Sequence, residues 1–264
     1  MALPLKKSIV IKIGGSTLGA HDTTVEDLVA LQKAGELPVV VHGGGKAISE
    51  WLDRQGVATR FVRGLRVTDA QTLPVVLAVL SGLVNKGLVA AIISQGGRAI
   101  GLSGIDAHLI EARIRDSELG YVGEIVSINP DPIRTLLGAG YIPVIAPVGL
   151  ERPDQGSEAG SPLNINADTA AAEIAVALGA ERLIFLTDMA GVCDSSGGVI
   201  PRLSGAEAKS LIGLGTISGG MIPKVEACLR ALEMVPITRV IDGRVAHALL
   251  SEVEGRGLGT TIVR

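Results

Sequence analysis

The chain has 264 residues, of which 47% are hydrophobic, 19% charged and 2% aromatic. This length favours one large domain, or two lobes that share a sheet, and the composition favours an ordered core of Val, Ile, Leu and Ala. The net charge of −3 argues against a nucleic-acid-binding surface and gives no sign of membrane binding.

Cysteine is scarce, which bears on the cellular compartment. Cys193 and Cys228 are too few for a disulfide framework or a zinc site. We expect both to be buried thiols in a reducing cytoplasm. The first apolar run ends at Lys12 and leaves no secretory signal, so the expected location is cytoplasmic.

Two stretches near the start of the chain combine a strand pattern with glycines. Residues 8–13 are predicted as a buried strand that ends at Gly14 and Gly15, and residues 38–41 as a strand that ends at the triplet 43–45. A helix between them makes a right-handed βαβ unit, so both glycine turns fall at the carboxyl end of a parallel sheet, where open α/β folds bind ligands. The triplet predicts either an anion site or a tight turn without a ligand.

Both helices of this unit have sequence signals. The first is expected to begin at a capping box of Thr23 and Glu26. The second follows the glycine triplet at once, and Ile48, Trp51 and Leu52 form its predicted apolar face at i, i+3 and i+4.

Residues 73–93 form the most apolar long segment. Thr68 or Asp69 is the predicted N-cap of this helix, and Asn85 and Lys86 interrupt its apolar run, which argues against a membrane span. Apolar residues cover most of its faces, so we expect it to be buried all round, inside the fold or partly against another subunit. The sequence therefore predicts a homodimer through this helix.

The second half of the chain alternates strands and helices. Residues 99–128 contain three short strands that suggest an antiparallel or hairpin insertion, and residues 151–162 are expected to be a surface loop. The other predicted strands are 141–146, 182–187, 237–241 and 260–263, and the predicted helices are 130–138, 169–178, 204–212, 221–234 and 244–251. The expected fold class is α/β, a three-layer αβα sandwich with a mainly parallel open sheet.

Several standard site motifs are absent from the sequence. The P-loop pattern fails because Ala47 follows Lys46 and Val40 stands where the first glycine belongs, and no G-x-G-x-x-G follows a strand. The four histidines have no metal-ligand spacing. We interpret His42 as a turn residue that bonds to backbone rather than as a base.

Two lysines stand beside glycine turns in unusual positions. Lys12 lies in an apolar strand, where it either snorkels from a sheet edge or reaches an anion at the glycine turn. Lys224 follows Gly220 at the start of a helix, where the dipole disfavours a cation unless an anion is bound. Asp168 could pair with such a lysine or cap a helix, and the spacing leaves both open.

Seven short motifs occur in one order along nearly the whole chain. They occupy residues 12–16, 41–45, 64–69, 164–168, 186–192, 219–224 and 242–247. Each is weak by itself, but together they resemble the amino-acid kinase family. The best-matching members of that family phosphorylate the γ-carboxylate of N-acetyl-L-glutamate with Mg-ATP in L-arginine biosynthesis.

The resemblance implies a division of labour along the chain. Residues 1–179 would form an N-terminal lobe that binds the acetylated amino acid and dimerises, and residues 180–264 a C-terminal lobe that binds ATP, with one continuous sheet. The implied catalytic residues are Lys12, Lys224 and Asp168; the substrate-binding residues are Gly44, Gly45, Arg66 and Asn164; the nucleotide-binding residues are Gly14, Gly15, Asp188, Met189, Ala190, Gly191, Val192, Cys193, Thr216, Ile217 and Ser218. ATP and Mg²⁺ are the implied cofactors, and no protein ligand to the metal is expected.

Two departures from the family pattern bear on regulation. Ile105 stands where a lysine is common in the family, which weakens any ligand contact there. Few residues precede the first predicted strand, whereas the arginine-inhibited members have an extra N-terminal helix that links dimers into hexamers. The resemblance therefore predicts a homodimer with weak or no arginine feedback.

Other activities remain open at this stage. A relative that phosphorylates acetylated or carrier-linked 2-aminoadipate in lysine biosynthesis differs only in acceptor length. Carbamate, uridylate and aspartate kinases share the glycine turns but match the substrate residues less well. A catalytically silent member that only binds a ligand would not need Lys12, Asp168 and Lys224 together. A regulatory protein partner is unknown.

Overall fold

The computed structural model describes residues 8–14, 23–152 and 160–264, and one eight-stranded sheet runs through the described fold. All neighbouring strands are parallel except β13 and β14. Their order is β12 (Arg202–Ser204), β14 (Thr260–Val263), β13 (Ile237–Asp242), β11 (Arg182–Thr187), β1 (Ile9–Ile13), β2 (Pro38–His42), β8 (Ile142–Ala146) and β5 (Ala99–Ser103). The mainly parallel open sheet is therefore confirmed.

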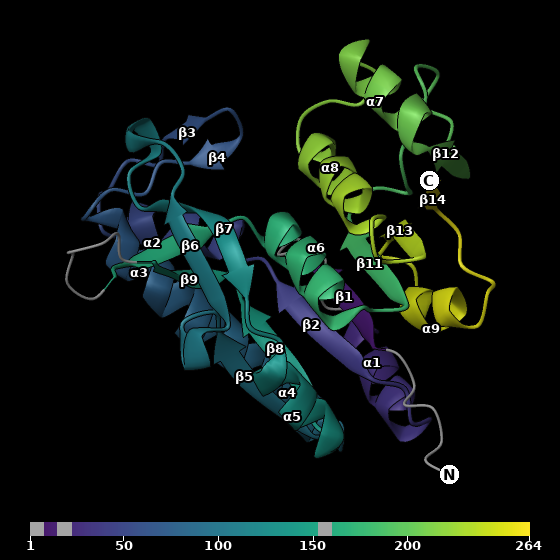
Figure 1. Cartoon of the computed structure of the whole chain (residues 1–264), viewed down its shortest axis with the longest axis horizontal. Helices are drawn as coiled ribbons and strands as arrows, with labels where there is room; N and C mark the ends of the chain where they lie inside the picture. Colours follow the sequence, from purple (N-terminus) through teal and green to yellow (C-terminus); the bar gives the residue numbers. More distant parts are fainter. Residues whose placement is uncertain (1–7, 15–22, 153–159) are drawn as a thin grey trace.

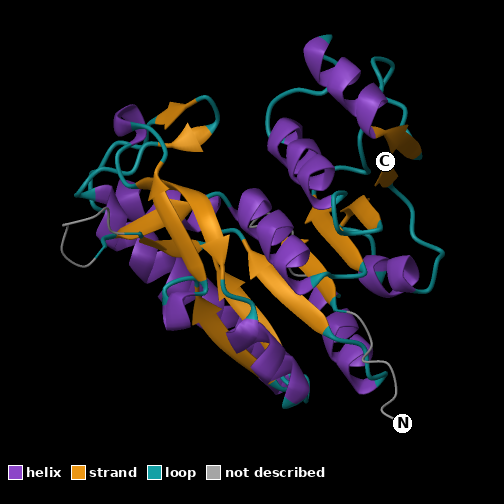
Figure 2. Cartoon of the chain, in the orientation of Figure 1, coloured by secondary structure: helices purple, strands orange, loops and turns teal. Residues whose placement is uncertain are grey.

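Helices cover both faces of this sheet (Figures 1 and 2). One face packs on α1 (Thr24–Lys33), α4 (Asn85–Ser94) and α9 (Ala248–Val253), and the other on α5 (Asp131–Gly138), α6 (Ala167–Leu178), α7 (Gly205–Gly213) and α8 (Met221–Ala231). The alternation of strand side chains divides the core accordingly. Ile9, Ile11 and Ile13 of β1 join the cluster on the α1 and α4 side, whereas Val10 faces α6. The three-layer αβα prediction is confirmed.

A second, smaller sheet closes into a barrel beside the main one. It contains β6 (Ile110–Ile114), β7 (Val122–Ile128), β9 (Val148–Glu151) and β10 (Pro162–Ile165). The antiparallel hairpin expected in this region is confirmed for β6 and β7. It is wrong for β5, which pairs in parallel with β8 in the main sheet. The ends of the expected 151–162 loop are also wrong, because β9 and β10 pair with each other there.

Two short elements complete the N-terminal half around the predicted site. The helix α2 (Gly45–Arg54) follows β2, and β3 (Phe61–Val62) pairs with β4 (Leu65–Arg66) in a hairpin. The predicted inner face of α2 is correct for Ile48 and Leu52, which are buried, but wrong for Trp51, whose side chain is exposed.

The long apolar helix has three parts. They are α3 (Thr72–Leu77), a π-helical segment η1 (Ala78–Val84) and α4. Asp69 accepts from the N–H of Thr72, as a cap does. The expectation of burial all round is wrong for this chain by itself, because Leu83 is 52% and Ile93 54% exposed. Residues 72–94 are long and apolar enough to span a membrane by length and composition alone, which is weak support for a span because core helices pass the same test.

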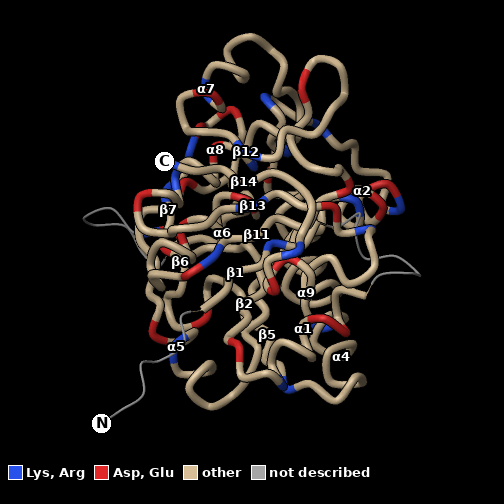
Figure 3. Tube along the Cα trace, turned by 90° about the vertical axis from the view of Figure 1, so that its right-hand side faces the viewer, with Lys and Arg blue, Asp and Glu red and all other residues tan. Residues whose placement is uncertain are grey.

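Two predicted helix starts are also corrected. Thr23 makes no capping bond to α1, because its hydroxyl accepts from the N–H of His247, 224 residues away. The helix expected at 244–251 begins at Ala248, since Arg244 turns back and binds Asp242 through its backbone and side chain. Acidic and basic residues are intermixed along the chain in Figure 3, without a face of one sign in that view.

Candidate active site

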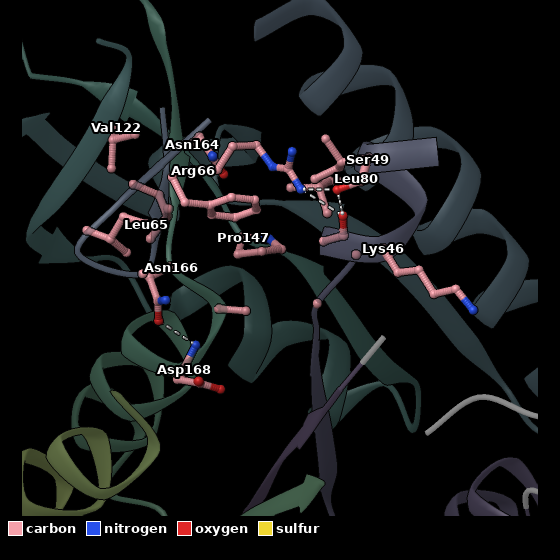
Figure 4. Close-up of a pocket in the computed structure, with 18 of the residues that line it drawn as sticks. Lys46, Ser49, Leu65, Arg66, Leu80, Val122, Pro147, Asn164, Asn166 and Asp168 are labelled. Carbon is pink, nitrogen blue, oxygen red and sulfur yellow. Dashed lines mark hydrogen bonds between the residues drawn. The ribbon is translucent and has the colours of Figure 1, made fainter. Parts of the chain in front are cut away.

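A cavity of about 470 Å³ opens where β1 and β2 end and α6 begins. Figure 4 shows the side chains that surround it. Six of the residues singled out from the sequence line this one cavity: Lys12, Gly44, Gly45, Arg66, Asn164 and Asp168. They come from β1, β4, β10 and the starts of α2 and α6, so the fold gathers distant segments at the carboxyl edge of the sheet.

Lys12 is the buried cation of the cavity. It alternates with Ile11 and Ile13 along β1, so its side chain faces α6, not the α4 side. Its Nζ lies 2.8 Å from Oδ1 of Asp168, and the side chain is only 8% exposed. The snorkelling alternative is therefore wrong, because β1 is a central strand and its lysine ends in a buried ion pair.

Asp168 joins this lysine to a second one. Its other oxygen, Oδ2, lies 3.3 Å from Nζ of Lys224 in α8, so one carboxylate contacts ammonium groups from two elements. Lys224 also donates to the carbonyl of Gly220. The three predicted catalytic residues thus form one cluster, in which two cations are held by a single anion.

The cap of α6 is Asn166, not Asp168. The side-chain oxygen of Asn166 accepts from the N–H groups of Asp168 and Thr169, as Figure 4 shows for Asp168. This settles the alternative that the sequence left open, since Asp168 is free to pair with the lysines. Asn166 also lines the cavity, and its spacing before an alanine-rich helix is a cap signal that could have assigned it.

The glycine turn gives the cavity its backbone donors. The N–H groups of Gly44 and Gly45 make no hydrogen bond to another residue in the described part of the chain, and they lie at the N-terminus of α2. Gly44 packs closely, because a Cβ there would come within 2.6 Å of Cδ2 of Leu80 and would force that side chain to shift. The turn therefore presents unpaired donors to an anion, where the helix dipole also favours negative charge.

Arg66 is held against the glycine turn and the first turn of α2. Its Nη2 donates to the carbonyl of Gly45 and to Oγ of Ser49, both at 2.8 Å, as drawn in Figure 4. The guanidinium carbon lies 4.9 Å from the centre of the Phe61 ring, and burial lowers the pKa of Arg66. Sequence reasoning missed Ser49, although it lies one turn after the glycine triplet on the same helix.

Asn164 is tied to the strand that bears Arg66. Its Nδ2 donates to the hydroxyl of Thr68, and that hydroxyl donates to the carbonyl of Arg66. Thr68 is completely buried. The buried hydroxyl therefore links the Asn164 side chain to the backbone of Arg66.

A second cavity, of about 260 Å³, adjoins the first. Its lining includes Lys12, Gly14, Asp188 and Lys224, and it shares Lys12 with the first cavity. Lys46, which the failed P-loop pattern set aside as a phosphate lysine, lines both cavities, and its side chain extends away from the first one in Figure 4. The two lysines held by Asp168 thus lie where the two cavities meet.

The remaining predicted nucleotide residues lie in two loops of the C-terminal part. Met189 and Ala190 are exposed, as is Ser218. Val192 and Ile217 are buried in the core beside α6 and α8, so these side chains anchor the loops. The other residues of these loops are Gly191, which is buried, and Cys193 and Thr216, which are half-buried. Gly15 lies outside the described residues.

The interpretation of His42 as a backbone-bonding residue is confirmed. Its Nδ1 lies 2.9 Å from the carbonyl oxygen of Gly43. Burial lowers the pKa of His42 to about 4, which keeps the ring neutral at physiological pH. No group of three or more His, Cys, Asp or Glu side chains suited to a metal ion gathers within the parts of the chain that the structure describes.

Comparisons with known proteins agree with this arrangement. Residues 7–242 match the model of the amino acid kinase family. The chain is 44% identical over 255 residues to an acetylglutamate kinase of Dehalococcoides mccartyi, covering 97% of this chain and 94% of that protein.

Solved structures give the same result for the fold. The smu.665 protein of Streptococcus mutans superposes with a TM-score of 0.82 at 31% identity, over 97% of this chain and 98% of that one. An N-acetylglutamate synthase of Neisseria gonorrhoeae, complexed with coenzyme A and N-acetyl-glutamate, superposes with a TM-score of 0.84 at 27% identity, over 98% of this chain and 60% of that one.

Proposed function

The chain belongs to the amino acid kinase family, and we propose that it transfers the γ-phosphoryl group of ATP to the γ-carboxylate of N-acetyl-L-glutamate. The product is N-acetylglutamyl 5-phosphate, an intermediate for L-arginine biosynthesis. The relatives named acetylglutamate kinase, 44% identical over nearly the whole chain, support this choice of acceptor.

The observation that carries the proposal is the pair of lysines where the two cavities meet. Lys12 and Lys224 both contact Asp168, and both line the second cavity, while Lys12 also lines the first. Phosphoryl transfer to a carboxylate brings two anions together, so its main requirement is positioning and neutralisation of charge. Two largely buried cations with a fixed separation meet that requirement, because one carboxylate holds both.

The acceptor fits the first cavity. Arg66 binds the α-carboxylate with its planar pair of donors, for which Nη2 exchanges a present partner, Gly45 or Ser49, for a carboxylate oxygen. Asn164 lines the same cavity and is a second polar contact. The γ-carboxylate lies at the glycine turn, where the N–H groups of Gly44 and Gly45 meet the incoming phosphoryl group. The acetyl group packs against apolar lining such as Leu65 and Val122.

The reaction needs no general base from the protein. A γ-carboxylate has a pKa of about 4.3 and is already ionised at neutral pH. One of its oxygens attacks the γ-phosphorus, a new O–P bond forms, and the bond to the β–γ bridging oxygen breaks, so that ADP leaves with that electron pair. Lys12 and Lys224 offset the charge on the transferred group, and Asp168 keeps both in position.

The nucleotide belongs to the second cavity and to the loops that follow β11. Gly14 and Asp188 line that cavity, and residues 189–193 and 216–218 complete the proposed ATP side. The described residues form no cage for a metal, so Mg²⁺ is proposed to arrive with the ATP phosphates, as this ion commonly does. Residues 1–179 would then be the acceptor lobe and residues 180–264 the nucleotide lobe.

The proposed assembly is a cytoplasmic homodimer through residues 73–93. Leu83 and Ile93 are more than half exposed on this helix, which favours burial against a second copy. Gly82 and Gly87 have open space where a Cβ would lie, which allows two helices to approach closely.

The test is ADP formation with N-acetyl-L-glutamate, N-acetyl-2-aminoadipate, carbamate or no acceptor. We expect kcat/KM for N-acetyl-L-glutamate to exceed the others by at least about tenfold. A higher kcat/KM with N-acetyl-2-aminoadipate than with N-acetyl-L-glutamate would indicate an enzyme of lysine biosynthesis. Thermal stabilisation by N-acetylglutamate without any turnover would indicate a binding protein.

A lysine substitution tests the charge argument within the same assay. Lys224→Met is expected to lower kcat by about 10²–10³, by analogy with the loss of one preorganised donor. Lys209→Met removes an exposed lysine of α7 and is the matched control, with kcat unchanged. Near-normal turnover of Lys224→Met would remove that lysine from the mechanism.

A further inference from the structure

His42 lies at the end of β2, immediately before the glycine turn. It is fully buried, and it shares the strand face of Val40, which packs on the α4 side of the sheet. Its two ring nitrogens have different neighbours. Nδ1 lies 2.9 Å from the carbonyl oxygen of Gly43, and Nε2 lies 3.2 Å from Nδ2 of Asn85.

Asn85 decides which ring nitrogen carries the proton. Its Nδ2 also lies 2.9 Å from the carbonyl of Val144 and 3.3 Å from that of Leu102. The end of the Asn85 amide that faces these two carbonyl oxygens must be the NH₂ group, because the amide oxygen cannot donate to them. The orientation of the Asn85 side chain is therefore fixed. Nε2 of His42 faces this same NH₂ group, where an Nε2–H would find no acceptor. Nε2 is therefore unprotonated, and the proton of the neutral ring lies on Nδ1.

The proton on Nδ1 donates to Gly43 and so orients the next peptide unit. In a trans peptide the C=O and the following N–H point in opposite directions, and the described chain has no cis peptide bond. The Gly43 carbonyl points to the imidazole on the α4 side of the sheet. The N–H of Gly44 therefore points to the opposite side, where Lys12 faces α6 and the acceptor cavity opens.

Neighbouring contacts fix the rest of the turn. The N–H of Gly43 donates to Ile13, and the carbonyl of Gly44 accepts the first bond of α2 from Ile48. The peptide between Gly43 and Gly44 is then restrained by the His42 imidazole. Without that bond the unit could rotate and turn its N–H away from the cavity.

We infer that His42 is a positioning residue for phosphoryl transfer: as the Nδ1–H tautomer held by Asn85, it aims the Gly44 N–H at the transferring phosphoryl group. The inference rests on the proposed function, because the oriented N–H matters only if charge develops in that cavity. His42 touches neither substrate nor the transferred group, and it acts entirely through the Gly43 carbonyl.

The tautomer is tested first on the unmodified protein, by NMR spectra that correlate the ring nitrogens with the ring protons. We expect one of the four histidines to be protonated at Nδ1 and unprotonated at Nε2, without titrating between about pH 5 and pH 8. Substituting His42 identifies its signal by loss. The Nε2–H tautomer, or a charged ring near neutral pH, would overturn the inference.

Two substitutions of His42 then separate orientation from packing. In His42→Asn the amide Nδ2 occupies the place of the ring Nδ1, so it can still donate to the carbonyl of Gly43. In His42→Gln the amide reaches only the position of the ring Nε2, so the bond to Gly43 is lost. The NH₂ group of Asn85 keeps two acceptors in both variants, because the Leu102 and Val144 carbonyls remain. We expect His42→Gln to lower kcat by about 10- to 100-fold with KM for the acceptor within about threefold, and His42→Asn to recover kcat to within about fivefold.

The control is His108→Gln, in an exposed histidine, which is expected to leave kcat unchanged. Equal kcat losses in the two His42 variants, or none in either, would overturn the inference while the wild-type enzyme stays active. A wild-type protein that phosphorylates no carboxylate acceptor would refute the proposed function, and the inference with it.

Discussion

Replacing Asp168 with asparagine perturbs the site at its central point. The amide has the shape of the carboxylate, so the change opens no cavity, but it removes the only charge that holds Lys12 and Lys224 in the described structure. Both ammonium groups are largely buried, with side chains 8% and 16% exposed. Two nearby cations without a counter-ion then repel each other and lose their fixed positions.

The size of the effect follows from the distances. At 2.8 and 3.3 Å the two attractions amount to about 6 and 5 kcal/mol for an effective dielectric constant of about 20, before the cost of desolvation is subtracted. Removing one partner of a buried ion pair costs about 3–5 kcal/mol, because the other charge is left uncompensated. We expect Asp168→Asn to lower the free energy of unfolding by that amount and kcat by at least about 10²-fold.

Urea unfolding and steady-state ADP formation measure the two effects separately. Asp53→Asn is the matched control, because Asp53 is an exposed carboxylate on α2 and its loss should change neither quantity. If the free energy of unfolding of Asp168→Asn stays within about 1 kcal/mol of wild type and its kcat within about fivefold, the proposed role of this carboxylate is refuted.

Three further predictions concern other parts of the molecule. Arg66→Lys should raise KM for N-acetylglutamate by about 10- to 100-fold with a smaller change in kcat, since lysine cannot form the paired contact; equal changes in both would contradict α-carboxylate binding. The pKa of His42 is about 4 in the folded protein and about 6.5 in the unfolded chain. As the pH drops from about 6.5 to 4, the unfolded chain binds a proton at His42 and the folded protein does not, so the free energy of unfolding should fall by about 3 kcal/mol. His42→Asn should abolish that part of the loss in urea titrations, and a pH profile parallel to wild type would disprove it. Leu83→Asp combined with Ile93→Asp should convert the proposed dimer to monomers in light scattering, and a mass equal to that of the wild type would exclude this interface.

Local patterns were sufficient for much of the fold and of the site. The β-branched runs of β1 and β2, with glycines after each, predicted two adjacent parallel strands whose ends meet at the cavity. Lys12 was predicted as a site residue because a lysine is unusual inside an apolar strand. In the structure its charge is compensated by the carboxylate of Asp168. The convergence of lysines and glycines at one edge followed from the topology of parallel sheets.

What the sequence could not predict depends on contacts between distant residues. Thr23 and Glu26 have the spacing of a capping box, but the N–H of His247 takes the Thr23 hydroxyl. The position of β5 beside β8 and the closure of the small barrel depend on strand pairings that local patterns do not specify. The sequence left Asp168 either as a cap or as a lysine partner, and the choice depends on Asn166, which caps α6, and on the two lysines that meet Asp168.

The most direct test of the account is the stoichiometry of acyl phosphate to ADP with N-acetyl-L-glutamate as acceptor. Hydroxylamine traps an acyl phosphate as a hydroxamate, and the account predicts one hydroxamate for each ADP released. It also predicts that Lys12→Met and Lys224→Met lower both products together. ADP without hydroxamate would mean that the phosphoryl group goes to water or another acceptor, and would contradict transfer to the γ-carboxylate.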